Sequence, residues 1–252
     1  MAATKQSESS ESPTNFRQNS SKQSVFEDDF MYGVTVAQSS IDYRLGFLRK
    51  VYGILTLQLA LTIVVAATFM SVEPVKMFVQ GSPFLLIVSV FMSFGLLIAL
   101  AVKRRESPIN MYLLVAFTFA ESYSIGTVVT LYDVQIVIQA FLLTITTTLA
   151  LTLYTFQSKR DFSSWGAALS STLWILILAG ILQIFMQNDI TELAIAIAGA
   201  VVFSLFIVYD THLLMHKLSP EEYILASINL YLDILNLFME ILKILNALNR
   251  KN

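Results

Sequence analysis

Two aspartates stand inside long apolar stretches near the C-terminal end of the sequence. Asp210 occurs in IVYDTHLLMHK, and Asp233 occurs in YILASINLYLDILNLFMEILKILNALN. A carboxylate that faces lipid costs about 2.5–3.5 kcal/mol on insertion scales, so these side chains should face other helices or water. Two carboxyl groups that meet in a poorly solvated site tend to share one proton. Such a pair can serve a cation path, and it can act as a pH-dependent latch that is closed while the proton is shared.

The second aspartate belongs to a polar stripe along its apolar segment. Asn229, Asp233, Asn236, Glu240 and Lys243 follow one another at steps of four, three, four and three, which keeps them on one helical face. A helix that is apolar around the rest of its circumference belongs inside a bundle. The alternative, a helix lying on the membrane surface, usually has a broad face rich in Lys and Arg. The narrow, mixed stripe favours the interior position.

The two apolar segments that carry the aspartates are joined by a short connection, which predicts antiparallel neighbours. Asp210 would then face the first turns of the last segment, where Asn229 and Asp233 lie. We expect the aspartates to form a functional pair. The alternative is that each is separately hydrogen-bonded to the backbone or to a tyrosine and only fixes the packing.

Further acidic residues are candidates for the same ion path. Glu121 lies centrally in AFTFAESYSIGTVV, and a mid-span carboxylate marks either a functional site or an internal hydrogen bond. Glu192 begins an apolar run and is either a path residue or a helix-start charge. Ser219-Pro220-Glu221-Glu222 fits a capping box, with cation attraction by Glu221 as the alternative. The candidate path beyond the aspartate pair comprises Asn229, Asn236, Glu240, Glu121, Glu192 and Glu221.

Composition identifies a membrane protein and excludes several classes of site. Of 252 residues, 56% are apolar and 13% are charged, whereas a soluble domain has roughly 25% charged residues. A net charge of −2 argues against nucleic-acid binding, which needs a basic face. The sequence has no cysteine. His212 and His216 are spaced like two metal ligands on one helical face, but no Glu stands between them and a loop position is expected. We therefore expect no cofactor and no tightly bound metal.

Apolar runs of about 20 residues, which a hydrocarbon core about 30 Å thick requires, predict an all-α protein with about seven transmembrane helices. The last helix should be central because of its polar stripe. Residues 1–40, rich in Ser, Gln, Asn and Thr, are expected to form a disordered cytosolic tail, and residues 41–252 the transmembrane domain. The expected spans are 48–70, 83–102, 111–132, 134–155, 165–186, 193–211 and 223–247.

The positions of Lys and Arg predict the orientation of the chain. Nine of them flank the spans on the side of the N-terminus, which is therefore expected in the cytosol. The opposite side would carry Lys76, Lys243, Arg250 and Lys251 if the chain crosses seven times. Six crossings with a re-entrant last segment are the alternative, because that arrangement would bring the basic C-terminal end to the cytosol.

Several segments resemble the transmembrane BAX inhibitor motif family, and its lifeguard branch in particular. They are FLRKVYGILTLQLALT, LYDVQIVIQAFLLT, YTFQSKRDFS and IVYDTHLLMHKLSPEEYILASINLYLDILNLF. The resemblance covers about residues 27 to 250. It implies a seven-helix fold whose last helix is wrapped by the other six, in a Golgi or endoplasmic-reticulum membrane.

The resemblance also implies a function. Members of this family act as calcium leak channels that lower stored calcium and blunt apoptotic signalling, and their di-aspartyl pH sensor falls on Asp210 and Asp233. Calcium and protons are then the permeating and regulating ions, and the bilayer is the partner. Bacterial members place an arginine in the second span near this pair, whereas PFLLIVSVFMSFGLLIALAV has none.

Three other functions are alternatives to a calcium leak. A calcium/proton exchanger would couple flux through these carboxylates to a counter-gradient, and a non-conducting anti-apoptotic scaffold would act by binding partners. An intramembrane aspartyl protease would place its second aspartate in a Gly-x-Gly-Asp run. Here that run is Leu230-Tyr231-Leu232-Asp233, whose bulky side chains argue against an enzyme.

Overall fold

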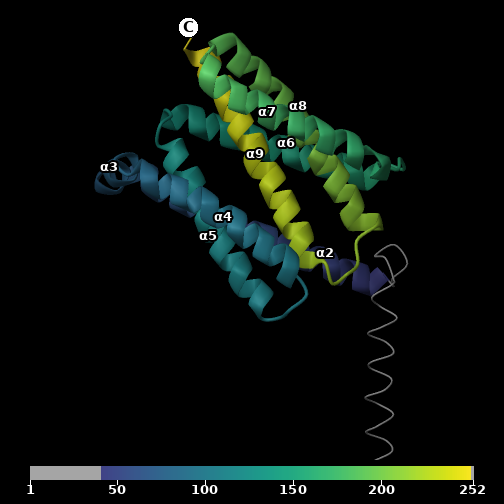
Figure 1. Ribbon diagram of the computed structural model, residues 1–252. Coiled ribbons are helices and arrows are strands. Elements are labelled where there is room, and N and C mark those ends of the chain that lie inside the picture. The colour runs from purple at the N-terminus through teal and green to yellow at the C-terminus, as the bar shows by residue number, and fades with distance from the viewer. Residues whose placement is uncertain (1–40, 251–252) are drawn as a thin grey trace, which may run out of the picture.

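The fold is a bundle of long helices, seen in a computed structural model that describes residues 41–250 (Figure 1). Within this range seven helices are long and apolar enough to cross a membrane, which confirms the predicted all-α, multi-span architecture. The expected tail at residues 1–40 lies outside the described residues. The elements are α2 (Ile41–Ser71), α3 (Glu73–Gln80), α4 (Pro83–Lys103), α5 (Ile109–Val129), α6 (Val134–Gln157), the 3-10 turn η2 (Ser163–Trp165), α7 (Gly166–Met186), α8 (Asp189–His216) and α9 (Tyr223–Asn249).

Most span boundaries agree with the apolar runs, and one short helix was not expected. Glu73, Pro74 and Lys76 follow the expected first span, 48–70, and interrupt its apolar run. In the structure they begin α3, with Pro74 in the first turn, where its missing N–H costs nothing. Val79 is buried, whereas Met77 and Phe78 are 60% and 59% exposed. Helix α3 thus connects α2 to α4 as an amphipathic piece with apolar side chains on its outer face.

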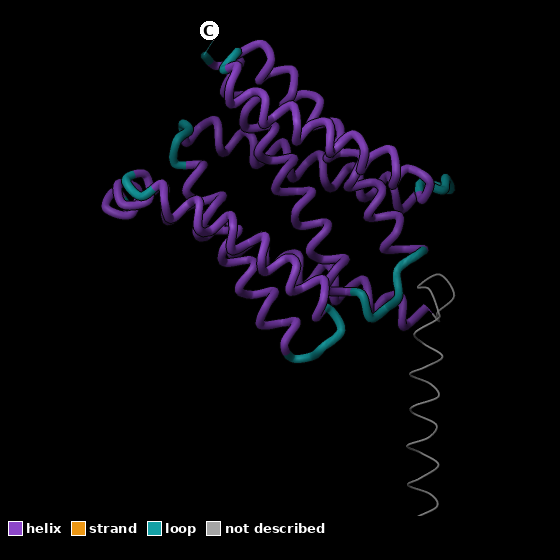
Figure 2. Tube along the Cα trace, in the orientation of Figure 1, coloured by secondary structure: helices purple, strands orange, loops and turns teal. Residues whose placement is uncertain are grey.

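Helix α9 runs through the middle of the bundle between two groups of helices. In Figure 1, α2, α4 and α5 lie on one side of α9, and α6, α7 and α8 lie on the other. The tube in Figure 2 shows that short loops join most of the helices. Helix α9 packs directly against α8, α6, α2 and α5, while α4 packs mainly on α5 and α7 on α8. The implied wrapping by all six spans is therefore uneven, with α4 and α7 forming the outer parts of the two groups.

The continuity of α9 bears on the number of crossings. It is one unbroken helix of 27 residues, which corresponds to about 40 Å at 1.5 Å per residue. A re-entrant segment would need a break near its middle. The structure therefore favours seven crossings over the alternative with six.

A network of hydrogen-bonded hydroxyl groups joins α9 to α2 and α5. The hydroxyl of Tyr231 in α9 is 2.8 Å from that of Thr62 in α2, which is 3.0 Å from the hydroxyl of Ser122 in α5. Nearby, Gln58 Nε2 donates to Thr118 Oγ1 over 3.1 Å. Lipid offers no partner for such groups, so they must pair within the protein. Between transmembrane helices each bond contributes on average about 0.6 kcal/mol.

Substitution of Gly199 tests the close packing of α8 on α9. A Cβ at Gly199 would lie 2.9 Å from Glu240 Cγ, whereas a Cβ at Gly180 in α7 meets nothing within 4 Å. We expect Gly199→Leu to lower the free energy of unfolding by about 1–3 kcal/mol through overpacking. Thermal unfolding in detergent measures the effect, with Gly180→Leu as the matched control. Equal melting temperatures for the two variants would show that α8 and α9 are not in tight contact there.

Candidate functional site

A cavity of about 560 Å³ lies between α9 and the two outer helices, α4 and α7. Helices α5 and α8 complete its walls. Much of the lining is apolar, but polar side chains gather on the walls formed by α4, α5, α8 and α9. None of the described residues that line the cavity is a Lys, an Arg or a His. The polar lining comprises Ser93, Glu121, Tyr209, Asp210, Asn229, Asp233 and Asn236.

The structure brings the two aspartates together inside this cavity. Asp210 projects from α8 and Asp233 from α9, and the two side chains line the same cavity as neighbours. A bond between two carboxyl groups requires that one of them carries a proton to donate. Asp233 is 8% exposed, so bulk water does little to solvate a second negative charge. Two carboxyl groups thus lie close together in a poorly solvated site, while the sharing of a proton between them and their role in an ion path stay predictions.

Three of the other candidate path residues share the cavity with the aspartates. Glu121 enters from α5 and has Ser93 of α4 as its polar neighbour. Asn229 and Asn236 lie on the α9 face that also carries Asp233. Asn236 is exposed although the residues on both sides of it in α9 are buried, because its side chain faces the cavity. Oxygen-bearing side chains from α5, α8 and α9 thus converge on one space.

Glu240 and Lys243 of the polar stripe lie near the C-terminal end of α9, and Glu192 lies at the start of α8. Glu240 Oε1 lies 2.9 Å from Lys243 Nζ, and the Glu240 side chain packs on Gly199. Glu192 is exposed in the first turn of α8. Burial raises the pKa of Tyr132, and the nearby carboxylates of Glu192 and Glu240 raise it further. Neither Glu240 nor Glu192 lines the cavity of the aspartates.

The capping box expected before the last span is wrong. The Ser219 hydroxyl is buried without a partner, and the Ser219 carbonyl accepts a turn hydrogen bond from the Glu222 amide at 2.9 Å. The Glu222 carboxylate instead lies 3.5 Å from Arg104 and 3.3 Å from Arg105 in the α4–α5 loop. These ion pairs compete with the cap, so α9 begins only after Glu222. Glu221 lies in the same turn, outside the cavity lining.

At the C-terminal end of α8, beyond Asp210, His212 contacts the loop that follows α6. His212 Nε2 lies 2.9 Å from Asp161 Oδ1, and the ring of His212 stacks on that of His216 at 4.5 Å. Hydrogen bonds from the hydroxyl and the backbone amide of Ser163 hold the pKa of Asp161 well below its usual range. The histidines therefore belong to a structural contact between α8 and the loop after α6. Across residues 41–250 no group of three His or acidic side chains is placed to hold a metal ion.

Sequence reasoning did not select two residues of the cavity, Ser93 and Tyr209. Ser93 stands four residues after Ser89 in the most apolar span, and that spacing is the signal that could have indicated a polar face. Tyr209 is positioned by Gly166 at the start of α7, where a Cβ would overlap the tyrosine hydroxyl. No local signal in the sequence connects these two residues, because they lie in different helices.

Comparison with known proteins identifies the family. The chain matches the family model described as inhibitor of apoptosis-promoting Bax1 over residues 44–250. The chain belongs to this family. The match includes both aspartates, Glu121 and all seven candidate membrane spans apart from the first residues of α2, and it confirms the resemblance that the motifs indicate.

Relatives within the family are similar over most of their length. The chain is 55% identical to the Golgi anti-apoptotic protein of Vaccinia virus (strain Lister), a match that covers 90% of this chain and 96% of that protein. It is 52% identical to protein lifeguard 4 of Mus musculus with the same coverage of both chains. Bax inhibitor 1 of Schizosaccharomyces pombe is 38% identical over 89% of this chain and 85% of the yeast protein.

Cysteine labelling tests whether the cavity of this family member holds water. The natural sequence has no cysteine, so a single introduced thiol reports on one position. We expect Asn236→Cys to react with a charged thiol reagent at least about tenfold faster than Ile175→Cys, because the reactive thiolate forms in water and not in lipid. Ile175 is the control because it is 65% exposed on the outside of α7. Equal rates at the two positions would mean that the cavity excludes water.

Proposed function

We propose that this protein is a pH-sensitive calcium leak channel of an intracellular membrane. The observation that carries the proposal is the cavity in which Asp210, Asp233 and Glu121 converge with two asparagines. Its lining, within residues 41–250, includes no Lys, Arg or His. Carboxyl groups inside a membrane protein mark ion and proton pathways. A cavity with this lining favours cations and disfavours anions.

The donor set suits calcium and suits permeation. Calcium takes six to eight oxygen ligands, from carboxylates, amides and water. Three carboxyl groups and two asparagine side chains line the cavity, yet no three of the described acidic or histidine side chains are close enough to form a metal site. A passing ion would thus keep part of its water. Conduction requires binding of this weak kind, because an ion that is held tightly does not leave.

The aspartate pair supplies the pH dependence. While Asp210 and Asp233 share one proton, the hydrogen bond that this proton would make holds α8 and α9 together in the cavity. Loss of the proton leaves two negative charges in a poorly solvated site, and their repulsion separates the helices. Ser93 and apolar residues are what α4 contributes to the lining, so the closed state in this protein relies on the shared proton and not on an arginine of the second span.

The cellular role follows from the relatives. Two of them carry names that describe a Golgi anti-apoptotic protein and a Bax inhibitor. We infer that this chain lies in the Golgi or endoplasmic-reticulum membrane with its N-terminus in the cytosol, and that the leak inhibits apoptosis by lowering stored calcium. The excess of Lys and Arg on the N-terminal side of the spans supports this orientation.

Calcium flux from liposomes, measured against pH, tests the latch. We expect flux through the natural protein to rise with pH, by up to about tenfold per unit if one proton controls each channel. Asp233→Asn removes one of the two carboxyl groups that share the proton, and it should reduce the change of flux with pH to less than about twofold per unit. Asp189→Asn, at the exposed start of α8, is the matched control and should keep the natural profile.

Two outcomes of the flux measurement would contradict the proposal. If Asp233→Asn conducts with an unchanged pH profile, the pair is not the latch. If an imposed proton gradient drives calcium uphill, the protein is a calcium/proton exchanger and not a leak.

Cells that lack the protein provide a test of the anti-apoptotic role. Re-expression of the natural chain should lower stored calcium and reduce death after an apoptotic stimulus, and Asp189→Asn should do the same. The double variant Asp210→Asn, Asp233→Asn should do neither, because it lacks two of the three carboxyl groups of the path. Calcium indicators in the store and counts of surviving cells measure the two effects. Full protection by the double variant without a change in stored calcium would favour a non-conducting scaffold.

A further inference from the structure

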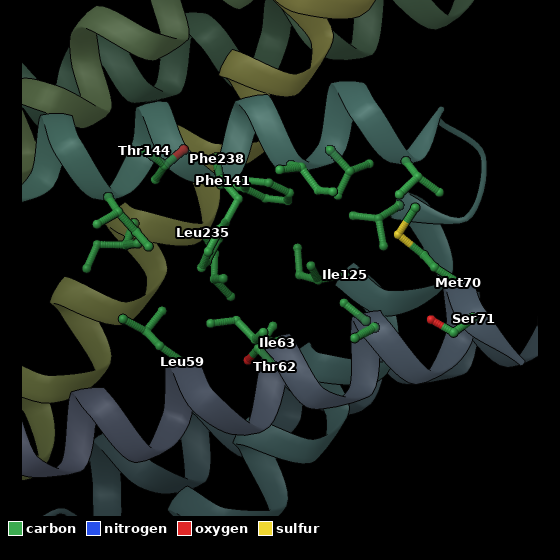
Figure 3. A pocket seen from close by; sticks show the side chains of 18 residues that line it. Leu59, Thr62, Ile63, Met70, Ser71, Ile125, Phe141, Thr144, Leu235 and Phe238 are labelled. Carbon is green, nitrogen blue, oxygen red and sulfur yellow. The ribbon is translucent and has the colours of Figure 1, made fainter.

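A second cavity, of about 370 Å³, lies on the other side of α9, between α2 and α6. Figure 3 shows Leu59, Ile63 and Met70 of α2 along one wall and Phe141 of α6 along the opposite wall. Its polar lining residues are Thr62, Ser71 and Thr144, and all its other lining residues are apolar. We call this space the α2–α6 groove.

The threonines of the groove have partners within the protein. The Thr62 hydroxyl donates to the Gln58 carbonyl at 2.9 Å and is also bonded to the Tyr231 hydroxyl at 2.8 Å. The Thr144 hydroxyl donates to the carbonyl of Ala140 at 2.8 Å. These groups require no ligand. Cavities lined in this way stay dry and take apolar guests, so the chemistry of the groove selects a hydrocarbon.

The mouth of the groove faces the bilayer. Ile63 of α2 is 42% exposed, and Ile138 and Ile145 of α6 are 52% and 39% exposed, although all three line the groove. Both helices are membrane spans, so the medium at the mouth is lipid and not water. The α2 wall extends from Leu59 to Ser71, which is about 18 Å at 1.5 Å per residue. That length is more than half of a hydrocarbon core of about 30 Å.

We propose that the α2–α6 groove binds one acyl chain of a membrane phospholipid. The groove is elongated, apolar, internally satisfied in its threonine hydroxyls and open to the hydrocarbon region, and acyl chains are the molecules present there at high concentration. The lipid headgroup would lie near Ser71 and Val134, where α2 ends and α6 begins and where the groove reaches the end of the spans.

The bound chain would support the wall of the polar cavity. Ile125 of α5 and Leu235 of α9 line both the groove and the cavity of the aspartates. Leu235 is 6% exposed and stands two residues from Asp233 in the same helix. An acyl chain in the groove therefore packs against the back of the partition that separates lipid from the carboxyl groups.

Photolabelling tests the site without reference to conduction. The full chain is reconstituted in phosphatidylcholine vesicles that contain a tracer phosphatidylcholine with a diazirine in one acyl chain, and labelled peptides are identified by mass spectrometry. We expect labels to concentrate on residues 59–71 and 134–145. Ala67→Phe fills the groove from an exposed lining position and should reduce this labelling several-fold. Ala168→Phe, on the exposed surface of α7, is the matched control and should leave it unchanged.

The possible results separate a bound lipid from other occupants. Labels spread evenly over all exposed spans and unaffected by Ala67→Phe would overturn the proposal, because they would show ordinary surrounding lipid. Absence of lipid labels from the groove, together with cross-links between two copies of the chain at these residues, would also overturn the proposal, because it would show a protein interface there. Far-ultraviolet circular dichroism of Ala67→Phe confirms that the variant is folded.

A second measurement connects the groove to the path and rests on the proposed function. If the acyl chain supports the shared partition, Ala67→Phe should change calcium flux by several-fold at fixed pH while keeping its pH dependence, because the aspartate pair is intact. Unchanged flux together with lost labelling would leave the lipid site in place and remove its influence on the path. Absence of flux in the natural protein would contradict the proposed function and not the groove, which labelling detects independently.

Discussion

The need to satisfy polar groups inside a bilayer determines the arrangement of this protein. Lipid offers no hydrogen bond, so each polar side chain of a span must find a protein partner or an internal cavity. Helix α9 carries two such sets on different faces, with Tyr231 on one and Asp233 on another. Tyr231 pairs with Thr62 of α2, whereas Asp233 meets Asp210 of α8. A helix with both requirements has to stand between the two groups of helices, and much of α9 is accordingly buried.

Much of this arrangement could be predicted from the sequence, because the signals that mattered were carried within single segments. Apolar run length gave the seven spans, and the spacing of polar residues in α9 indicated an interior helix. The short connection after Asp210 predicted that α8 and α9 are neighbours, which the structure confirms. The shared setting of Asp210 and Asp233 then follows from antiparallel geometry. Family membership was indicated by motifs that extend over most of the chain.

What could not be predicted depends on contacts between distant segments. Glu222 looks like a capping residue in its local sequence, but Arg104 and Arg105, more than a hundred positions earlier, attract its carboxylate. Likewise, the polar stripe of α9 is continuous in the sequence but divides in the structure. Asn229, Asp233 and Asn236 face the cavity, while Glu240 packs on Gly199. Periodicity reports which residues share a face, and it does not report how far along the helix one neighbour gives way to another.

The position of α9 also explains why the bundle has two cavities of opposite character. Each space beside α9 lies between one helix of the first group and one of the second: α2 and α6 border the groove, and α4 and α7 border the cavity of the aspartates. The side with the carboxyl groups keeps these polar side chains away from lipid, since an uncompensated charge in hydrocarbon is costly. The side with the satisfied threonines has no such requirement and suits lipid. Among the residues that the structure describes, only Ile125 and Leu235 line both spaces. Any movement that separates Asp210 from Asp233 therefore acts on a partition whose other surface faces the groove. The cavity of the aspartates and the groove are thereby separated by a partition that includes two apolar side chains.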